Sequence, residues 1–507
     1  MELSGTLHYH QHLLGNPNKK MNANSNSKNH LFLFLLSVFF FIKLALIKHV
    51  PLINDEAYTL TISKYFSLSY FDHPPLMMWI SNFFHFFQPD TAYSFRVPHV
   101  IFGILTSFFL YKIGSLIYSI KTGVFAAILY FISPFFFFSG GFFVVPDAAL
   151  NFSVAGSTFF AMKIIFENNN KSYLWIALGL LLAMAFLSKY QSYLFALALF
   201  AAFVIWKRDA FLNSKFYITL VISVFGLLPV IIWNIDNGFD SFNFHHSRSS
   251  YNFNIFHAMN SIFLQSLLLL PTTAILIFLS LVNYVKDQRK EESFLVLLSF
   301  PTILTFNFFM MASENSFSHW SMMGWMLLIP MASNRLNLIK SYIKKFFILK
   351  ILNIFLVFSL ISTLSIHAHT GFLTKSYRSV PEWDNTRELL NWKHIAEIIS
   401  ENLKESELKS LATLNWYDSG QLNVALNHNY YVGVIGPNTN HFKHIYLNSG
   451  NFYTLIIVRL INDEKNEDLT YWTQALGYKV NKVNTLPFLR GSRVYGTISL
   501  LSIDKGD

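Results

Sequence analysis

The chain has 507 residues, of which 53% are hydrophobic and only 13% charged, whereas soluble proteins carry about 25% charged residues. This composition cannot cover the surface of a soluble protein of this length, and its 55 phenylalanines exclude a disordered chain. The absence of cysteine excludes disulfides, cysteine-based zinc sites and a thiol nucleophile. The composition therefore predicts a polytopic membrane protein.

The apolar segments predict about eleven membrane-spanning helices, because a span needs roughly 20 apolar residues. The polar residues 1–30 are expected to form a disordered cytoplasmic tail. The apolar run from Leu31 lacks a small-residue cleavage site, so we interpret it as an uncleaved anchor. Residues 76–87 are apolar but too few to span, which favours an interfacial or re-entrant helix. The predicted spans are 31–48, 98–118, 123–139, 148–166, 173–188, 190–206, 216–233, 258–282, 293–311, 320–333 and 346–367.

Lysine and arginine residues gather on alternate loops. If the spans alternate in direction, these loops share one face with the N-terminal tail, and the positive-inside rule makes that face cytoplasmic. Membrane orientation therefore explains the net charge of +10, and no nucleic-acid partner is expected. The few cations on the opposite face are Lys48, Lys64, Arg96, Lys189 and Arg248.

From about residue 368 the chain becomes more charged, and its apolar runs shorten to the length of strands. Helical patterns over Glu388–Lys404 and Leu469–Leu476 alternate with these runs. The alternation predicts a small extracytoplasmic α/β domain over 368–507, after a transmembrane domain over 31–367. The expected strands are Leu411–Trp416, Tyr430–Ile435, Tyr453–Val458 and Val494–Leu501.

The first external loop, residues 49–97, carries two acidic residues where a helix should begin. They have an ordinary explanation, because Asn54 or Asp55 can cap the helix and its dipole favours negative charge. Consecutive helical positions diverge by about 100°, so at most one of Asp55 and Glu56 points squarely into a shared cleft. Both are candidate catalytic acids; Asp55 is preferred, and Glu56 is expected rather to fix the loop.

Other polar residues lie at sharp bends on the same face. His73 precedes two prolines, which hold it on a rigid turn, and the plain alternative is a helix-breaking turn with an incidental histidine. Asp147 follows Pro146 and begins a span, so it is either a capping residue or a second functional carboxylate. Lys189 lies between two spans and either snorkels to the headgroups or serves as a cation in the site.

The outward-facing set suits transfer from a phosphate leaving group, because a carboxylate can orient or deprotonate an acceptor while cations neutralise the phosphate. The adjacent His245 and His246 rarely ligate one ion together and have no carboxylate cluster beside them, so no metal and no cofactor is expected. The candidate site residues are Asp55, Glu56 and Asp147 as catalytic acids, with Tyr58, His73, Arg96, Lys189, Arg248 and His319 for substrate binding.

The motifs of these loops resemble those of bacterial family 39 glycosyltransferases, which are related to dolichyl-phosphate-mannose–protein mannosyltransferases and to ArnT-like transferases. The most specific part is Asp55 through Tyr58 followed by Tyr70 through Leu76. Further matches in the same order are Phe95–Pro98, Pro146–Leu150, Leu187–Tyr190, Pro229–Asn234, His319–Trp320 and Trp383–Trp392.

The resemblance implies a C-type glycosyltransferase fold, with a bundle of membrane helices and interfacial helices in the first periplasmic loop. It implies inverting transfer of a sugar from a polyprenyl (undecaprenyl) phosphate donor to an envelope glycolipid, glycan or protein acceptor, at the periplasmic face of a bacterial inner membrane. By the same resemblance, Asp55 is the catalytic or acceptor-positioning acid and Asp147 the second acid. His73 replaces the lysine that ArnT-like members carry before Pro-Pro, which moves the expected phosphate contact to Arg96 and Lys189.

Two other classes of function compete with an enzyme. A transporter or flippase of lipid-linked saccharides would bury ionisable residues along its spans and show repeat symmetry, whereas this chain concentrates them in external loops. A structural or assembly protein with an exported domain would leave the acidic and basic loop residues unexplained.

Overall fold

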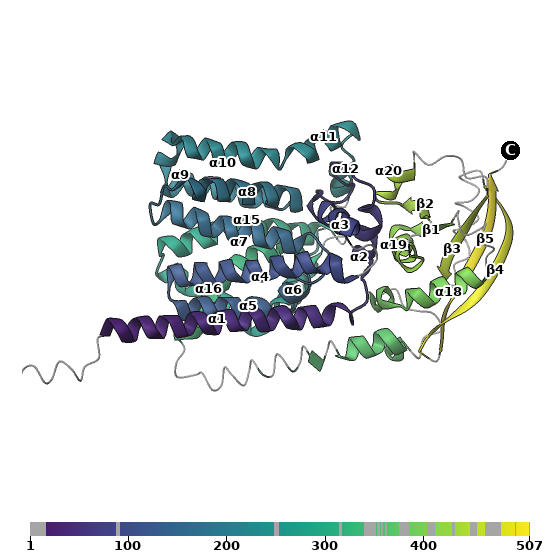
Figure 1. Ribbon diagram of the computed structural model, residues 1–507, viewed down its shortest axis with the longest axis horizontal. Helices are drawn as coiled ribbons and strands as arrows, with labels where there is room; N and C mark the ends of the chain where they lie inside the picture. The colour runs from purple at the N-terminus through teal and green to yellow at the C-terminus, as the bar shows by residue number, and fades with distance from the viewer. Residues whose placement is uncertain are drawn as a thin grey trace, which may run out of the picture.

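The computed structural model is a bundle of helices followed by a smaller α/β domain at one end (Figure 1). It describes residues 17–87, 92–247, 253–313, 317–338, 351, 355, 358–359, 362–374, 385–402, 411–427, 431–446, 454–461, 478–491 and 493–505.

The bundle is built from apolar helices, which satisfy their own backbone hydrogen bonds as a hydrocarbon environment requires. Five described helical segments are long and apolar enough to cross a membrane. A bent pair of helices, α13 (Ile255–Leu269) with α14 (Pro271–Lys286), would make a sixth. Three further apolar helices, α5, α8 and α9, are shorter. A polytopic helical architecture is thus confirmed, while the number of about eleven spans stays a prediction. The helices are α1 (Pro17–Ile47), α2 (Asn54–Ile62), α3 (Leu76–Phe87), α4 (Ala92–Ile117), α5 (Ile120–Ile132), α6 (Pro134–Phe138), α7 (Asp147–Ile165), α8 (Ser172–Ser188), α9 (Ser192–Trp206), η1 (Arg208–Leu212), α10 (Ser214–Phe225), α11 (Leu228–Asp236), α12 (Asp240–Ser247), α13 (Ile255–Leu269), α14 (Pro271–Lys286), α15 (Lys290–Ala312), η2 (Ser318–Ser321) and α16 (Met322–Leu338).

Two predictions about the bundle are wrong in detail. The predicted span 258–282 is two helices bent by 108°, because Leu270 adopts a φ of 70° and Pro271 cannot continue the preceding helix. The predicted disordered tail 1–30 is too long, because α1 already begins at Pro17. Proline is a favourable first helical residue, and no glycine or proline between Pro17 and His30 interrupts the helix. Residues 1–16 and most of the predicted span 346–367 lie outside the described residues.

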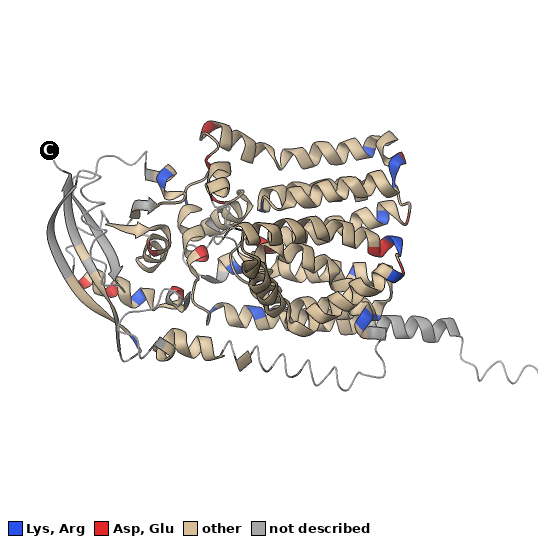
Figure 2. Cartoon of the chain, turned by 180° about the vertical axis from the view of Figure 1, so that it is seen from behind, with Lys and Arg blue, Asp and Glu red and all other residues tan. Residues whose placement is uncertain are grey.

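Lysine and arginine residues gather at the end of the bundle farthest from the α/β domain (Figure 2). The loops there contact one another: Lys207 Nζ donates to Asn168 Oδ1, and Arg289 Nη2 donates to the carbonyl of Ile117 at 3.4 Å. The prediction that the cationic loops share one face is therefore confirmed for the described loops.

The α/β domain contains a five-stranded sheet in the order β2-β1-β3-β5-β4. β1 pairs in parallel with β2 and β3, while β5 runs antiparallel to both β3 and β4. The four predicted strands are present, but β4 was not predicted. Its sequence is rich in polar residues and includes Pro487, which an edge strand tolerates. The remaining elements are η4 (Phe372–Thr374), η5 (Asn385–Leu389), α18 (Trp392–Asn402), β1 (Leu411–Asn415), α19 (Trp416–Ala425), β2 (Val432–Asn438), α20 (Phe442–Tyr446), β3 (Thr454–Ile461), β4 (Tyr478–Arg490) and β5 (Arg493–Lys505).

The helices α18 and α19 lie between the sheet and the bundle (Figure 1), and α19 packs directly on α2. The approach is so close that a Cβ at Gly420 would lie 2.8 Å from the backbone nitrogen of Tyr58. Gln421 Nε2 donates to the carbonyl of Leu52 at 3.1 Å and to Asn54 Oδ1 at 3.0 Å. This packing joins the domain to the first external loop.

Candidate functional site

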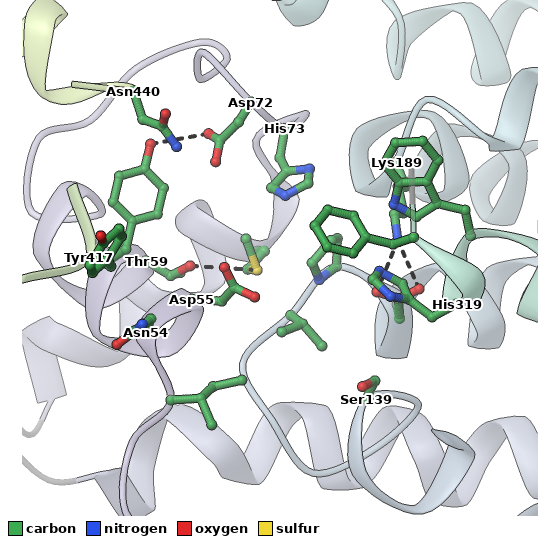
Figure 3. A pocket seen from close by; sticks show the side chains of 18 of the residues that line it. Asn54, Asp55, Thr59, Asp72, His73, Ser139, Lys189, His319, Tyr417 and Asn440 are labelled. Atoms are coloured by element: carbon green, nitrogen blue, oxygen red, sulfur yellow. Dashed lines mark hydrogen bonds and ion pairs between the residues drawn. The ribbon is translucent and has the colours of Figure 1, made fainter. Parts of the chain in front are cut away.

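A cavity of about 510 Å³ lies where the bundle meets the α/β domain (Figure 3). Its walls come from the start of α2, the turn before α3, the α6–α7 and α8–α9 connections, η2 and the start of α19. Segments that are far apart in the sequence thus contribute polar groups to one space. The polar and charged lining residues are Asn54, Asp55, Tyr58, Thr59, Asp72, His73, Ser139, Asp147, Lys189, His245, His319, Glu388, Tyr417 and Asn440.

The cavity brings together most of the residues predicted from sequence. The six that line it are Asp55, Tyr58, His73, Asp147, Lys189 and His319. Two others, Glu56 and Arg96, do not line it, and Arg248 lies outside the described residues.

Asp55 and Glu56 point in different directions, as their 100° offset on a helix predicts. Asp55 is exposed and its carboxylate faces the cavity in Figure 3, while Glu56 is fully buried. The expected cap is wrong, because Ile53 occupies the N-cap position and its N–H donates to Glu56 Oε2 at 3.2 Å. Glu56 therefore makes the capping hydrogen bond at the start of α2, a role that Asn54 or Asp55 could have had.

Arg96 and Glu56 form a buried ion pair that does not line the cavity. Arg96 Nε donates to Glu56 Oε1 at 2.8 Å. Arg96 Nη1 donates to the carbonyls of Ile47 and Val50, and Nη2 donates to the carbonyl of Pro51. Both side chains are fully buried, so each neutralises a charge that would otherwise be costly to bury. These contacts argue against the expectations that Arg96 holds a phosphate and that Glu56 is a catalytic acid, because their charges and hydrogen bonds are used inside the protein.

Asp147 and Lys189 meet across the cavity wall. α7 begins at Asp147, as predicted, and Lys189 ends α8 in an extended conformation that turns its side chain toward this helix start. Lys189 Nζ donates to both carboxylate oxygens of Asp147, at 2.9 and 3.0 Å. Both residues are at least nine-tenths buried, and both line the cavity. The pair places one cation and one anion beside the space that a substrate would occupy.

His319, at η2, lies next to this pair (Figure 3). Its ring stacks on Phe317 and on Phe135, with centroids 5.5 and 6.1 Å apart. The pKa of His319 is lowered to about 4, chiefly by burial and then by the positive charge of Lys189, while the Asp147 charge opposes the shift more weakly. His319 is therefore neutral near pH 7 and offers a hydrogen bond, not a charge.

The α6–α7 connection, residues 139–146, carries Asp147 into position and is held from three sides. Lys43 Nζ of α1 donates to the carbonyls of Phe137 and Gly141, at 2.8 and 2.7 Å. The Tyr130 hydroxyl donates to the carbonyl of Gly140 at 2.8 Å, and the N–H of Val144 donates to Glu56 Oε1 at 2.9 Å. The buried Glu56–Arg96 pair thus supports the wall that presents Asp147.

Asp72 is a cavity residue that our sequence reasoning did not select. The Tyr58 hydroxyl donates to Asp72 Oδ1 at 3.2 Å, and the N–H of His441 donates to the Tyr58 oxygen at 3.0 Å. Burial, with the nearby Asp72 charge, raises the pKa of Tyr58 well above its ordinary value, so the phenol stays protonated. Asp72 stands beside His73 in the loop motif, and an acidic residue next to the selected histidine was a signal that could have marked it.

The arrangement can bind an anion at one place and accept a proton at another. Lys189 and neutral His319 can donate to phosphate oxygens, while Asp55 presents a carboxylate on the other side of the space (Figure 3). Among the described residues, no three His, Asp or Glu side chains gather as metal ligands would.

Part of the chain is similar in sequence to known transferases. The family described as dolichyl-phosphate-mannose-protein mannosyltransferase matches residues 72–233, which include His73, Asp147 and Lys189. The undecaprenyl phosphate-alpha-4-amino-4-deoxy-L-arabinose arabinosyl transferase 2 of Proteus mirabilis is 30% identical over 125 residues. That match covers 24% of this chain and 22% of the transferase.

Comparison of whole structures extends the similarity to nearly the full chain. The crystal structure of ArnT from Cupriavidus metallidurans bound to undecaprenyl phosphate aligns with a TM-score of 0.62 at 11% identity, covering 93% of this chain and 97% of that one. Its apo structure aligns with the same TM-score, covering 94% and 98%. The bundle with its appended domain therefore has the C-type glycosyltransferase fold. Within that class its structure is similar to that of ArnT, and the resemblance to the family 39 transferases is confirmed as a similarity of sequence and fold.

Proposed function

We propose that the protein transfers a sugar from a polyprenyl (undecaprenyl) phosphate-linked donor to a hydroxyl group of an envelope glycolipid, glycan or protein. The observation that carries this proposal is one cavity in which Asp55 faces the Lys189–Asp147 pair and His319. The undecaprenyl phosphate bound to the structurally similar ArnT supports a donor of this kind. The cavity adjoins the apolar bundle, in which a polyprenyl chain could lie.

The phosphate of the donor is placed at the Lys189 end. Lys189 supplies the only formal positive charge among the described lining residues, and Asp147 fixes its ammonium group. His319, being neutral, donates a hydrogen bond to the same phosphate without adding charge. These donors stabilise the negative charge that grows on the phosphate as the glycosidic bond breaks.

Asp55 acts on the acceptor. An acceptor hydroxyl held between Asp55 and the donor transfers its proton to the Asp55 carboxylate as its oxygen attacks the anomeric carbon. The bond from that carbon to the phosphate oxygen breaks, and its electron pair leaves with polyprenyl phosphate. Attack from the side opposite the phosphate inverts the anomeric configuration.

The test is transfer by purified full-length protein from an undecaprenyl-phosphate-linked sugar, compared with its Asp55→Asn variant. We expect Asp55→Asn to lower kcat by about 10²- to 10⁴-fold, the usual contribution of a general base. Binding of undecaprenyl phosphate should be retained, because Asp55 lies away from Lys189. A folded Asp55→Asn protein with full activity would remove Asp55 from the mechanism.

We also propose that the cavity and the α/β domain face the periplasm of a bacterial inner membrane. The cation-rich end of the bundle lies opposite the α/β domain (Figure 2), and the positive-inside rule assigns that end to the cytoplasm. The donor would then be consumed on the extracytoplasmic side.

A further inference from the structure

The cavity has two chemically different ends. The bundle supplies Asp147, Lys189 and His319 at one end, and the α/β domain supplies Trp416 and Tyr417 at the other. In Figure 3, Asp55 and His73 lie between Tyr417 on one side and Lys189 and His319 on the other. The proposed mechanism uses the charged end and Asp55 and leaves the end formed by the domain without a role.

The aromatic residues at the domain end are held firmly but are not buried completely. Both open α19, whose first turn is fixed by Asn415, since its side-chain oxygen accepts the N–H of Asp418 at 2.8 Å. Trp416 meets Tyr417 edge-on at 5.6 Å between centroids, and it meets Tyr58 at 5.0 Å. Each ring is half-buried, so part of its surface remains open to the cavity.

Polar side chains that can bind hydroxyl groups surround these rings. Asn440 follows β2 in a left-handed conformation, with a φ of 46°, and lines the cavity. Asn54 lies at the start of α2, where its oxygen accepts from Gln421, and Glu388 lines the cavity from η5. Amides and carboxylates together offer both donors and acceptors, as a sugar hydroxyl requires.

We infer that this end of the cavity is the acceptor subsite, and that the acceptor it binds is a saccharide. The inference rests on the proposed function and narrows its acceptor class. A pyranose ring presents an apolar face of C–H groups, which can pack on an aromatic ring, and a rim of hydroxyls, which bind to amides and carboxylates. Trp416 and Tyr417 supply the rings, and Asn440, Glu388 and Asn54 supply the polar groups.

A polypeptide acceptor fits these walls less well. Strand addition, in which backbone hydrogen bonds hold the peptide on an exposed strand edge, is one common way to bind an extended peptide. The edge strand β2 ends before Asn440 and does not line the cavity in the described residues. A saccharide bound at Trp416 and Tyr417 would instead direct a hydroxyl toward Asp55, with the donor phosphate beyond it at Lys189.

The test separates the acceptor from the donor by kinetics on the full-length protein in lipid nanodiscs. The donor probe is a radiolabelled undecaprenyl-phosphate-linked sugar, and the acceptor probes are the glycolipid-and-glycan fraction and the protein fraction of a bacterial envelope. We expect Trp416→Leu and Tyr417→Leu each to raise the half-saturating amount of the glycolipid-and-glycan fraction about tenfold, because each variant removes one aromatic ring that packs on the sugar. The half-saturating donor concentration should stay within about twofold of wild type, and Trp416→Phe should restore most of the acceptor dependence.

Tyr431→Leu is the matched control, because this half-buried tyrosine of the same domain packs on Tyr65 and does not line the cavity. Equal effects of Trp416→Leu and Tyr417→Leu on donor and acceptor, or effects no larger than the control's, would overturn the subsite. Label transferred by wild type into the protein fraction alone would overturn the saccharide assignment. If wild type neither binds undecaprenyl phosphate nor consumes the donor, it is the proposed function that fails. Trp416→Leu also removes the packing of Trp416 on Tyr58. If that loss prevents folding, Tyr417→Leu and Glu388→Gln provide the same test.

Discussion

Lys189 is the only lysine or arginine among the described residues of the cavity wall, and Asp147 already accepts two hydrogen bonds from it. A phosphate that binds here must share the ammonium group with Asp147. The pair thus holds a strongly hydrated cation in one place before the substrate arrives, which lowers the reorganisation that binding would otherwise require.

Removing the cation and removing its anchor should have different effects on the donor. We expect Lys189→Met to weaken binding of undecaprenyl phosphate by at least about tenfold, because a charge-assisted hydrogen bond contributes roughly 1.5–3 kcal/mol. Asp147→Asn leaves the cation present and should weaken binding much less, while lowering kcat through a mispositioned Lys189. Equilibrium binding in nanodiscs measures the first effect and steady-state transfer the second. Equal losses of binding in the two variants would contradict this division of roles.

At the scale of elements, the external loop is held in place by charged residues that do not line the cavity. Glu56 joins the start of α2 to α4 through Arg96 and to the α6–α7 connection through Val144. Lys43, within the apolar helix α1, holds the end of α6 through the carbonyl of Phe137 and the same connection through the carbonyl of Gly141. Ionisable residues inside a membrane protein are expensive to bury, and here each of them makes hydrogen bonds that join the walls of the cavity.

The Glu56–Arg96 pair should show strong coupling in stability. We expect Glu56→Leu or Arg96→Leu to lower the free energy of unfolding by about 3–5 kcal/mol, because each leaves an unpaired buried charge. The double variant should lose clearly less than the sum of the two. Thermal unfolding of the detergent-solubilised variants measures the coupling.

The control for this cycle is the surface pair Lys163–Glu167, an i,i+4 ion pair in contact at 2.6 Å. Its side chains are partly exposed, so we expect a coupling of no more than about 0.5 kcal/mol. Additive losses for Glu56 and Arg96 would show that the buried pair does not act as a unit.

His441 lies at the contact between the external loop and the α/β domain, and we expect it to make this contact sensitive to acid. Its Nδ1 accepts the N–H of Phe71 at 3.2 Å, and its neighbours include Lys443, His444 and Tyr70. Burial, with the charges of His444 and Lys443, lowers the pKa of His441 to about 3. The unfolded chain then binds more protons than the folded one below about pH 6.5, so stability is lost as the pH falls.

The expected loss from His441 alone is about 2 kcal/mol between pH 7 and pH 5. His441→Asn retains an acceptor for Phe71 and cannot be protonated, so its melting temperature should fall less over this range. Thermal unfolding at pH 7.5, 6 and 5 provides the measurement, with His394→Asn, an exposed histidine of α18, as the control. A wild type and a His441→Asn variant with parallel pH profiles would argue against this role for the buried ring.

At the scale of the whole molecule, the α/β domain completes the cavity. Tyr58 and Met77 of the external loop share one apolar cluster with Val434 and Phe442 of the domain. Gly420 allows α19 to touch the backbone of α2, which brings Trp416 and Tyr417 to the cavity. The domain is therefore a wall of the site and not an appendage.

The orientation proposed for the molecule can be tested with single cysteines, because the chain has none of its own. Leu212 is 90% exposed at the cation-rich end, and Asn438 is exposed on the α/β domain. In intact cells, a membrane-impermeant maleimide should label Asn438→Cys but not Leu212→Cys. Permeabilisation should make Leu212→Cys reactive, and the cysteine-free wild type gives the background. The reverse pattern would place the cavity in the cytoplasm.

The sequence by itself determined the class of architecture, because scarce charge and long apolar runs leave a chain no alternative to a membrane bundle. It also predicted the small α/β domain and six of the polar and charged residues that line the cavity, since charges outside the apolar runs are few and conspicuous. Only the tertiary structure decided which of those charges are available. In the sequence, Arg96 and Asp147 are both isolated charged residues near one face of the bundle. In the structure, Arg96 is paired with Glu56 away from the cavity, whereas Asp147 lines the cavity. A sequence pattern records where a charge lies along the chain. The partner of that charge depends on contacts between distant segments, such as the pairing of Glu56 with Arg96, and on the packing of domains, such as that of Gly420 on Tyr58.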